Sequence, residues 1–243
     1  MSDPFAKFGI THLSPSSLNL YCANPALWTG RYLLGWKDES GPAAFRGSAI
    51  EAGLDVFLFE RKEAEAFQRA QAKFNELVQG EASEAHEEER LNIAGMLKQA
   101  IEAVKPWPLP NGRQLRVEHR IQGVEVPIIG YIDYAFPDFD LDLKTTKACP
   151  SAIKGDHGRQ FSLYSAARQR PIKALYATAK KHAVYDLARE QAAMHLADLE
   201  RHARAVRHLL SRANDAKDAY RFFAVERSDF RWSPQTLAMT EAL

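Results

Sequence analysis

The amino-acid sequence predicts an α/β or α+β fold in one domain, residues 1–243, and two observations carry this prediction. Apolar residues recur at helical spacing through residues 1–110, whereas residues 111–213 contain short β-rich runs between further helical stretches. No repeat or low-complexity linker separates the two parts. We therefore expect a mainly helical N-terminal part, a sheet with flanking helices, and a C-terminal tail over residues 214–243.

Helices account for the first part. Ser14 followed by proline is typical of a helix start, since serine caps free backbone N–H groups and proline suits the first turn. Apolar spacing over residues 44–78 fits one long helix or two consecutive ones, and the acidic stretch 80–89 is expected to end one helix and open the next. Residues 91–104 are helical again until a run of prolines stops them.

Residues 111–213 contain short runs with the composition of β-strands. Residues 114–122, 126–136 and 139–145 are rich in β-branched and aromatic residues and are separated by turn-forming residues. We expect a helix over 156–168, strands over 172–178 and 182–185, and a long amphipathic helix over 189–213.

Composition limits the class of protein. With 243 residues, 46% of them hydrophobic, the chain buries roughly 70–75% of its unfolded surface, which excludes a disordered protein. No apolar run approaches the roughly 18–20 residues of a membrane span, and the first ten residues lack the apolar core of a signal peptide. Cys22 and Cys149 form no Cys-x-x-Cys pair, so we expect a cytoplasmic protein with reduced thiols.

The strongest chemical signal is the run Phe139-Asp140-Leu141-Asp142-Leu143-Lys144. Side chains alternate along a strand, so its two aspartates and its lysine share one face, with Asp140 expected to be solvated at the strand end. If this strand pairs with the preceding one about a turn centred between residues 137 and 138, Asp133 lies opposite Asp142. Two carboxylates whose Cβ atoms are roughly 4.5–5.5 Å apart repel each other unless a positive charge lies between them.

Two sources of that positive charge are open. Lys144 supplies it if the cluster is a structural ion pair on a solvated strand face. A divalent metal is the sharper hypothesis, because Mg²⁺ is usually held by one or two carboxylates and completes its shell with water and phosphate oxygens.

An acid on one strand followed by Asp-x-Lys on the next resembles the PD-(D/E)XK nuclease superfamily. Gly130-Tyr131-Ile132-Asp133 and Asp142-Leu143-Lys144-Thr145-Thr146 are similar to the motifs of its RecB-like and phage-exonuclease branch. Three further pieces fit that branch in the expected order: Leu13-Ser14-Pro15-Ser16-Ser17-Leu18 with Asn24-Pro25, Gly47 to Glu51 as Gly-x-x-x-Glu, and Gln160 to Tyr164 as Gln-x-x-x-Tyr.

The resemblance implies a restriction-endonuclease-like core, a mixed central sheet flanked by helices, and metal-dependent deoxyribonuclease activity. It implies Mg²⁺ or Mn²⁺ as cofactor, held by Asp133, Asp142, Glu51 and the Leu143 carbonyl. Lys144 would orient or help to deprotonate the attacking water and offset charge on the phosphate.

Gln160 and Tyr164 lie at i and i+4 on one helix face. The resemblance implies that they position the DNA end or the catalytic groups, while taken alone they fit an ordinary surface pair.

Many RecB-like nucleases hold an iron–sulfur cluster with one N-terminal and three C-terminal cysteines. Cys22 fits the first place, but residues 220–243 contain no cysteine, so we expect no cluster. The resemblance favours an exonuclease that processes DNA ends in recombination or repair, in a bacterial or phage-infected cell. A structure-specific endonuclease and a non-catalytic DNA-binding protein are the alternatives. A single-strand annealing protein or other recombination factor is a further candidate partner, and a homo-oligomer is compatible.

The net charge of +1 results from an acidic first part of the chain and a basic second part. Residues 1–150 hold 16 Lys and Arg against 21 Asp and Glu, while residues 151–243 hold 16 against 10. A charge run is usually a solvated face, but this one directly follows the expected active-site strand, where a phosphate backbone would lie. We therefore expect Arg159 and Arg168 to contact DNA, with Arg46 beside Gly47 as a third candidate.

Overall fold

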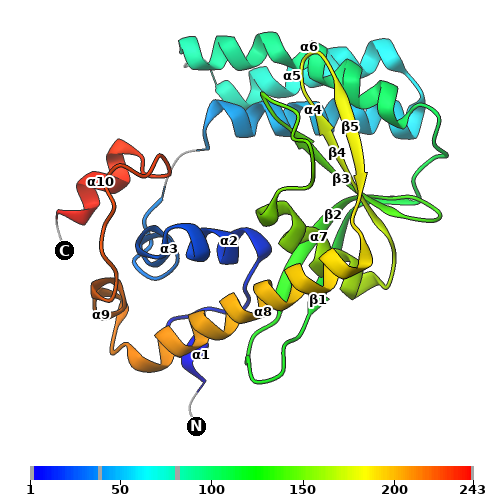
Figure 1. The fold of residues 1–243 in the computed structure, drawn as a ribbon. Coiled ribbons are helices and arrows are strands. Elements are labelled where there is room, and N and C mark those ends of the chain that lie inside the picture. The colour runs from blue at the N-terminus through cyan, green and yellow to red at the C-terminus, as the bar shows by residue number, and fades with distance from the viewer. Residues whose placement is uncertain (1–2, 38–39, 80–82, 242–243) are drawn as a thin grey trace.

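A computed structural model describes residues 3–37, 40–79 and 83–241, and its centre is one mixed sheet (Figure 1). The strands are β1 (Gly112–His119), β2 (Ile128–Ala135), β3 (Asp140–Thr145), β4 (Ile172–Ala177) and β5 (His182–Asp186), and they lie side by side in chain order. Neighbours run antiparallel except β3 and β4, which are parallel and therefore need a crossover; helix α7 (Gly155–Arg168) supplies it.

Three helices cover one face of the sheet: α4 (Pro42–Glu60), α5 (Glu63–Val78) and α6 (Glu84–Val104). Their core includes Leu54 and Phe74 packed with Leu141, Leu143 and other residues of β2 to β4. The apolar stretch 44–78 forms two helices, because the chain turns at Arg61, which has a left-handed φ of 58°. Residues 80–82, where a break was expected, lie outside the described residues.

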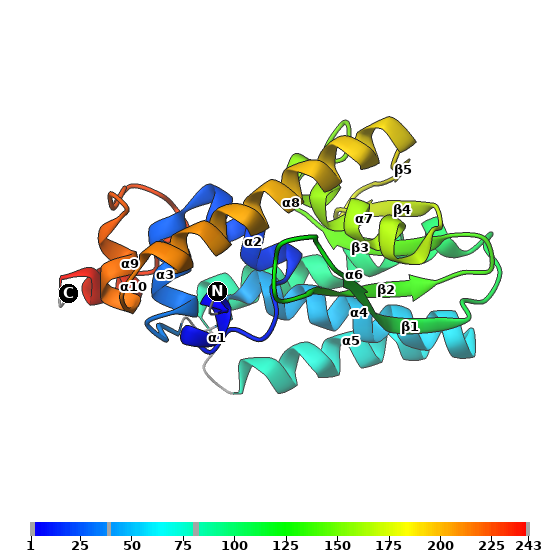
Figure 2. The ribbon, with the colours of Figure 1, turned by 90° about the horizontal axis from the view of Figure 1, so that it is seen from below.

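The opposite face packs against α7 and the long helix α8 (Arg189–Arg212), as the view from below in Figure 2 shows. Helices α1 (Pro4–Lys7) and α2 (Pro15–Ala23) extend this core. Ser14 caps α2 through a reciprocal side-chain bond with Ser17, as its position before Pro15 predicts.

The C-terminal tail folds back onto the N-terminal helices. Helices α9 (Ala216–Arg221) and α10 (Pro234–Thr240) lie near α3 (Pro25–Tyr32). Tyr220 and Trp232 of the tail share a small apolar core with Ala26 and Leu27 of α3. In the part of the chain that the structure describes, no helix is both long and apolar enough to cross a membrane.

The hairpin of β2 and β3 has the predicted register. Tyr134 pairs with Leu141 and Ala135 with Asp140, which places the turn between Pro137 and Asp138. Beyond the Tyr134–Leu141 pair the two strands separate, and Asp133 and Asp142 lie where the ladder opens.

Candidate active site

The side chains of β1 and β2 switch from one face of the sheet to the other at the same place along the two strands. Leu115 and its partner Ile132 belong to the core beneath α7 and α8. The next pair in the ladder, Arg113 and Tyr134, points to the opposite layer, where both side chains contact Asp55 of α4. Between them Gln114 has a left-handed φ of 48°, which a residue with a side chain rarely adopts and which breaks the alternation of a regular strand.

Asp133 lies opposite this irregular residue and is held from two sides. Its Oδ2 accepts a hydrogen bond from the Leu143 backbone N–H at 2.8 Å, and its Oδ1 lies 3.4 Å from the Gln114 Nε2 donor. The N–H and C=O of one strand residue point to the same strand edge. The Leu143 carbonyl therefore faces the edge that Asp133 occupies.

On β3 the buried Asp142 forms an ion pair with the partly exposed Lys144. Asp142 is 1% exposed, and the Lys144 Nζ lies 2.7 Å from its Oδ1. The same ammonium lies 5.7 Å from the centre of the Phe161 ring on α7, within the range of a cation–π contact. Lys144 is thus held between the acidic pair and the helix that follows it.

Glu51 brings a third carboxylate from α4. Burial raises the pKa of Glu51 to about 7, with the nearby Asp142 carboxylate as the next cause; Lys144 acts in the opposite direction. Burial, then Asp142 and Glu51, hold the pKa of Asp133 well above its ordinary value. The raised pKa values of Glu51 and Asp133 show that these two carboxyls lie close to each other and to Asp142 with too little positive charge nearby to balance them.

The one ammonium in this cluster stays charged. Burial alone would lower the pKa of Lys144, but the carboxylates of Asp142 and Asp133 outweigh burial and raise it. Lys144 is therefore a cation and a hydrogen-bond donor here rather than a base.

Helix α7 contributes Gln160 and Tyr164. The Gln160 Nε2 donates to the Tyr164 hydroxyl at 2.7 Å, and Tyr164 is 2% exposed. Burial, then the Asp142 carboxylate, raises the pKa of Tyr164. The tyrosine ring lies against Gly130 of β2: a Cβ at that position would come within 2.5 Å of Tyr164 Cε1. The glycine of Gly-x-x-Asp is required here so that this tyrosine can reach the acidic pair.

Comparison with known proteins identifies the family and the fold of the chain. A family model described as "PD-(D/E)XK nuclease superfamily" matches residues 12–229. The chain belongs to the PD-(D/E)XK nuclease superfamily. A solved structure from Eubacterium rectale, titled a "putative exonuclease", has the same fold with a TM-score of 0.59 and 13% identity, covering 96% of this chain and 94% of that one. A structure of a protein named SSO0001 also matches, with a TM-score of 0.36 and 13% identity over 76% of this chain and 83% of that one. A search of curated proteins finds no match.

The predicted family and its restriction-endonuclease-like fold are thus confirmed. The roles of the individual site residues stay predictions, although the structure does bring six of them together: Glu51, Asp133, Asp142, Lys144, Gln160 and Tyr164.

The carboxylates of Glu51, Asp133 and Asp142 are of the ligand type that suits a hard divalent cation. Carboxylate and carbonyl oxygens are the ligands that Mg²⁺ and Mn²⁺ prefer. As the side chains stand, the described residues bring no three His, Cys, Asp or Glu together as metal ligands. In this arrangement Lys144 contacts one oxygen of Asp142, and the Leu143 N–H donates to one oxygen of Asp133.

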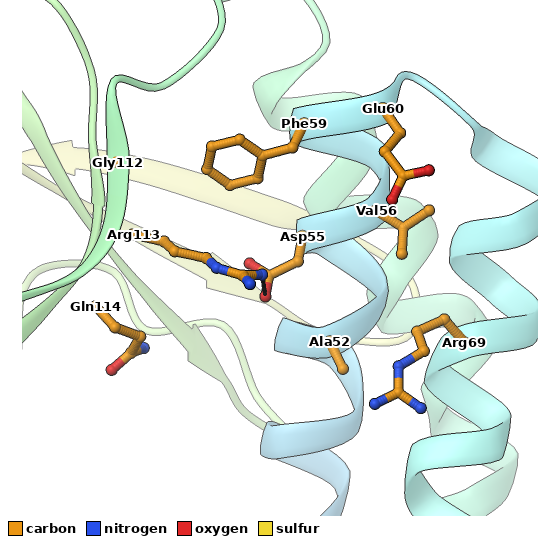
Figure 3. Close-up of a pocket in the computed structure, with 9 residues that line it drawn as sticks. All are labelled: Ala52, Asp55, Val56, Phe59, Glu60, Arg69, Gly112, Arg113 and Gln114. Atoms are coloured by element: carbon orange, nitrogen blue, oxygen red, sulfur yellow. Dashed lines mark hydrogen bonds and ion pairs between the residues drawn. The ribbon is translucent and has the colours of Figure 1, made fainter.

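A pocket of about 660 Å³ lies between α4, α5 and the start of β1 (Figure 3). Gln114, which contacts Asp133, lines it, and so does Asp55, which lies one helical turn after Glu51. Arg113 reaches from β1 to Asp55, whose other oxygen accepts from the Tyr134 hydroxyl at 3.0 Å. Asp55 is thus saturated with partners and is not a free ligand.

Arg46 has a different place from the one predicted. It is 4% exposed, pairs with the buried Glu89 of α6, and donates to the Thr145 carbonyl at 3.1 Å. Its guanidinium ties α4 to α6 and to the end of β3 and is not available to a DNA phosphate. The sequence could not show this, because Glu89 lies 43 residues away.

Arg168 is also engaged by a buried acid. Its Nε lies 3.2 Å from Oδ2 of Asp140, which is 1% exposed and not solvated as expected. Arg159 donates to the Asn19 side chain of α2 at 2.6 Å and is partly exposed, so its predicted DNA contact stays a prediction. Much of the basic surplus is paired within the fold: Lys173 with Asp186, Arg201 with Asp198, Arg204 with Glu200, and Arg207 with Glu125.

Sequence reasoning missed several residues around the acids. Asp55 could have been found, since it follows Glu51 by four positions on one helix face. Gln114 has no signal, because nothing in the sequence marks a non-glycine residue that adopts a left-handed φ.

Proposed function

We propose that this chain is a metal-dependent deoxyribonuclease, most specifically an exonuclease that processes DNA ends in recombination or repair. One observation carries the proposal: Asp133, Asp142 and Glu51, from three separate elements, crowd around a single lysine at the open end of a hairpin. Crowding of like charges lowers the stability of the fold, so such a cluster is expected where function requires it.

Asp133, Asp142, Glu51 and the Leu143 carbonyl would hold Mg²⁺ or Mn²⁺. A bound divalent cation supplies an activated water and neutralises charge on the phosphate and on the leaving oxygen. Lys144 contacts only Oδ1 of Asp142, so Oδ2 of this carboxylate would be the oxygen offered to the metal.

The chain's own residues then divide the remaining work. Lys144, kept protonated by Asp142 and Asp133, donates to the attacking water or to a phosphate oxygen. Gln160 and Tyr164 form a hydrogen-bonded pair beside the acids and position the DNA or the catalytic groups. Arg159, at the surface between α2 and α7, contacts the phosphate backbone.

The preference for DNA ends is supported by the fold shared with the Eubacterium rectale protein, whose title is "putative exonuclease". We further propose that residues 1–243 act as one nuclease domain in the cytoplasm. A recombination factor such as a single-strand annealing protein, or further copies of the chain, would be its protein partners.

Digestion of labelled DNA tests the activity. Linear duplexes labelled at the 5′ or 3′ end are incubated with the purified protein and Mn²⁺, beside a covalently closed circle. Stepwise loss of the linear duplex with an intact circle supports an exonuclease. Nicking of the circle favours a structure-specific endonuclease, and binding of DNA without cleavage favours a non-catalytic protein.

Lys144→Ala tests the site in the same assay. It should lower the cleavage rate at least about 10³-fold, because it removes the donor that faces the acids. Lys147→Ala is the matched control, since this exposed lysine pairs with Glu88 outside the cluster and should keep the wild-type rate. Equal rates for wild type and Lys144→Ala would contradict the assignment.

A further inference from the structure

The face of α7 that meets the acidic cluster continues one turn beyond Gln160. His157, Gln160 and Tyr164 follow one another at i, i+3 and i+7, which places them along a single helix face. Phe161, which lies under Lys144, belongs to the same stripe. His157 therefore extends the polar row of α7 toward the helix N-terminus.

Tyr176 of β4 and Phe161 of α7 place His157 beside Lys144. Its Nδ1 lies 2.7 Å from the Tyr176 hydroxyl, and Tyr176 pairs with Lys144 in the parallel ladder of β3 and β4. Side chains of ladder partners lie on the same face of a sheet. The centre of the imidazole ring also lies 6.0 Å from the centre of the Phe161 ring. The Lys144 ammonium lies 5.7 Å from the centre of the same Phe161 ring.

The hydrogen bonds of Tyr176 determine which imidazole nitrogen carries the proton. Burial raises the pKa of Tyr176 to about 12, so the side chain is a neutral hydroxyl. This hydroxyl accepts from the Lys154 backbone N–H at 3.5 Å, and among the described residues its own proton has no acceptor besides His157 Nδ1. The hydroxyl therefore donates to Nδ1.

The imidazole itself is neutral. Burial lowers the pKa of His157, the nearby Lys144 and Lys154 add to the effect, and the Asp156 and Asp142 carboxylates act against it. A neutral imidazole that accepts at Nδ1 carries its proton at Nε2. Nε2 has no partner among the residues that the structure describes, and His157 is partly exposed.

We propose that His157 is a further catalytic residue, which donates a hydrogen bond from Nε2–H to an oxygen of the DNA phosphate at the cleavage site. This inference rests on the proposed nuclease function. The site then holds a neutral donor in addition to the Lys144 cation, and Tyr176 acts as a positioning residue that fixes the tautomer. Gly158, the next residue, packs against His195 of α8, which anchors this turn of the helix from behind.

Two substitutions separate a donor at Nε2 from a packing role. In His157→Gln the side-chain amide can place an N–H near the former Nε2, whereas the shorter amide of His157→Asn reaches only the Nδ1 position. We expect His157→Asn and His157→Ala to lower kcat about 10²-fold with folding intact, and His157→Gln to recover most of the loss. His182→Ala is the control, since this exposed histidine of β5 bonds to Gln99 and should leave kcat unchanged.

A spectroscopic readout is independent of cleavage. The ¹⁵N shifts of labelled histidine in the metal-free protein should show His157 as the Nε2–H tautomer, and Tyr176→Phe should shift this resonance toward a tautomer mixture. An Nδ1–H tautomer in the wild type, or kcat and KM of His157→Ala equal to those of wild type, would overturn the proposal. A wild-type protein that cleaves no DNA would overturn the proposed function itself, and this proposal with it.

Discussion

The two helical layers meet the acidic hairpin with different chemistry. From one face α4 brings Glu51 and Asp55, carboxylates whose pKa values are raised, first of all by burial. From the other face α7 brings the uncharged side chains of His157, Gln160 and Tyr164: Gln160 donates to the Tyr164 hydroxyl, and His157 bonds to Tyr176 of β4. We therefore expect the α4 layer to supply negative charge for a cation and the α7 layer to supply donors and acceptors for the substrate.

The largest effect is expected on the α4 side. Glu51→Gln keeps the shape of the side chain but removes a metal ligand, so cleavage should fall at least about 10³-fold. The metal-free protein should melt a few degrees higher, because a buried carboxylate with like-charged neighbours is gone. Glu60→Gln, at the exposed end of the same helix, should change neither the rate nor the melting temperature.

The raised pKa of Glu51 on α4 also makes the stability of the fold depend on pH. The pKa of Glu51 is about 7 in the fold against an ordinary 4.5, so the folded state binds the proton more tightly. Without metal, this contribution is fully present below pH 4.5 and is lost as the pH rises through 7, by at most about 3 kcal/mol.

Urea unfolding in EDTA between pH 5 and 8 measures this loss. The difference between wild type and Glu51→Gln isolates it from the other acids, and saturating Mg²⁺ should stabilise the wild type more at pH 8 than at pH 5. A difference between the two proteins that does not change with pH would show that Glu51 is not perturbed.

The glycines of the two motifs differ in the space around them. Gly130→Ala should destabilise the protein by about 1–3 kcal/mol, since its Cβ would lie 2.5 Å from the Tyr164 ring that α7 places there. Gly47→Ala should be neutral or slightly stabilising, because its Cβ would meet only Thr145 Oγ1 at 3.7 Å. Urea unfolding compares the two variants, and equal effects would mean that Tyr164 can move aside.

A smaller effect is expected on the α7 side. Gln160→Ala removes the donor that holds the Tyr164 hydroxyl, so kcat should fall about 10-fold while affinity for Mg²⁺ stays the same. Gln68→Ala, on the exposed side of α5, is the control. If Gln160→Ala weakened metal binding as much as Glu51→Gln does, the division between the layers would be wrong.

Part of this site could be predicted from the sequence because part of it is local. The β2–β3 register depends on a short turn and on strand alternation, so Tyr134 lies opposite Leu141 as expected. Gln160 and Tyr164 meet because they are one helical turn apart.

The rest depends on partners that are distant in the chain. Arg46 pairs with Glu89 and Arg168 with Asp140, contacts that no local sequence pattern could show. The side chains of β1 and β2 change to the other face of the sheet at Gln114, whose left-handed φ cannot be recognised from the residue type. His157 gains its tautomer from Tyr176, which lies 19 residues away.

Calorimetric titration with Mn²⁺ tests the central claim, that Asp133, Asp142 and Glu51 bind a divalent metal together. Wild type and Asp55→Asn should both bind, since Asp55 is already paired with Arg113 and Tyr134. Asp133→Asn, which can still accept from the Leu143 N–H, should lose binding with its fold intact. No binding by the wild type, or equal binding by Asp133→Asn, would contradict the account.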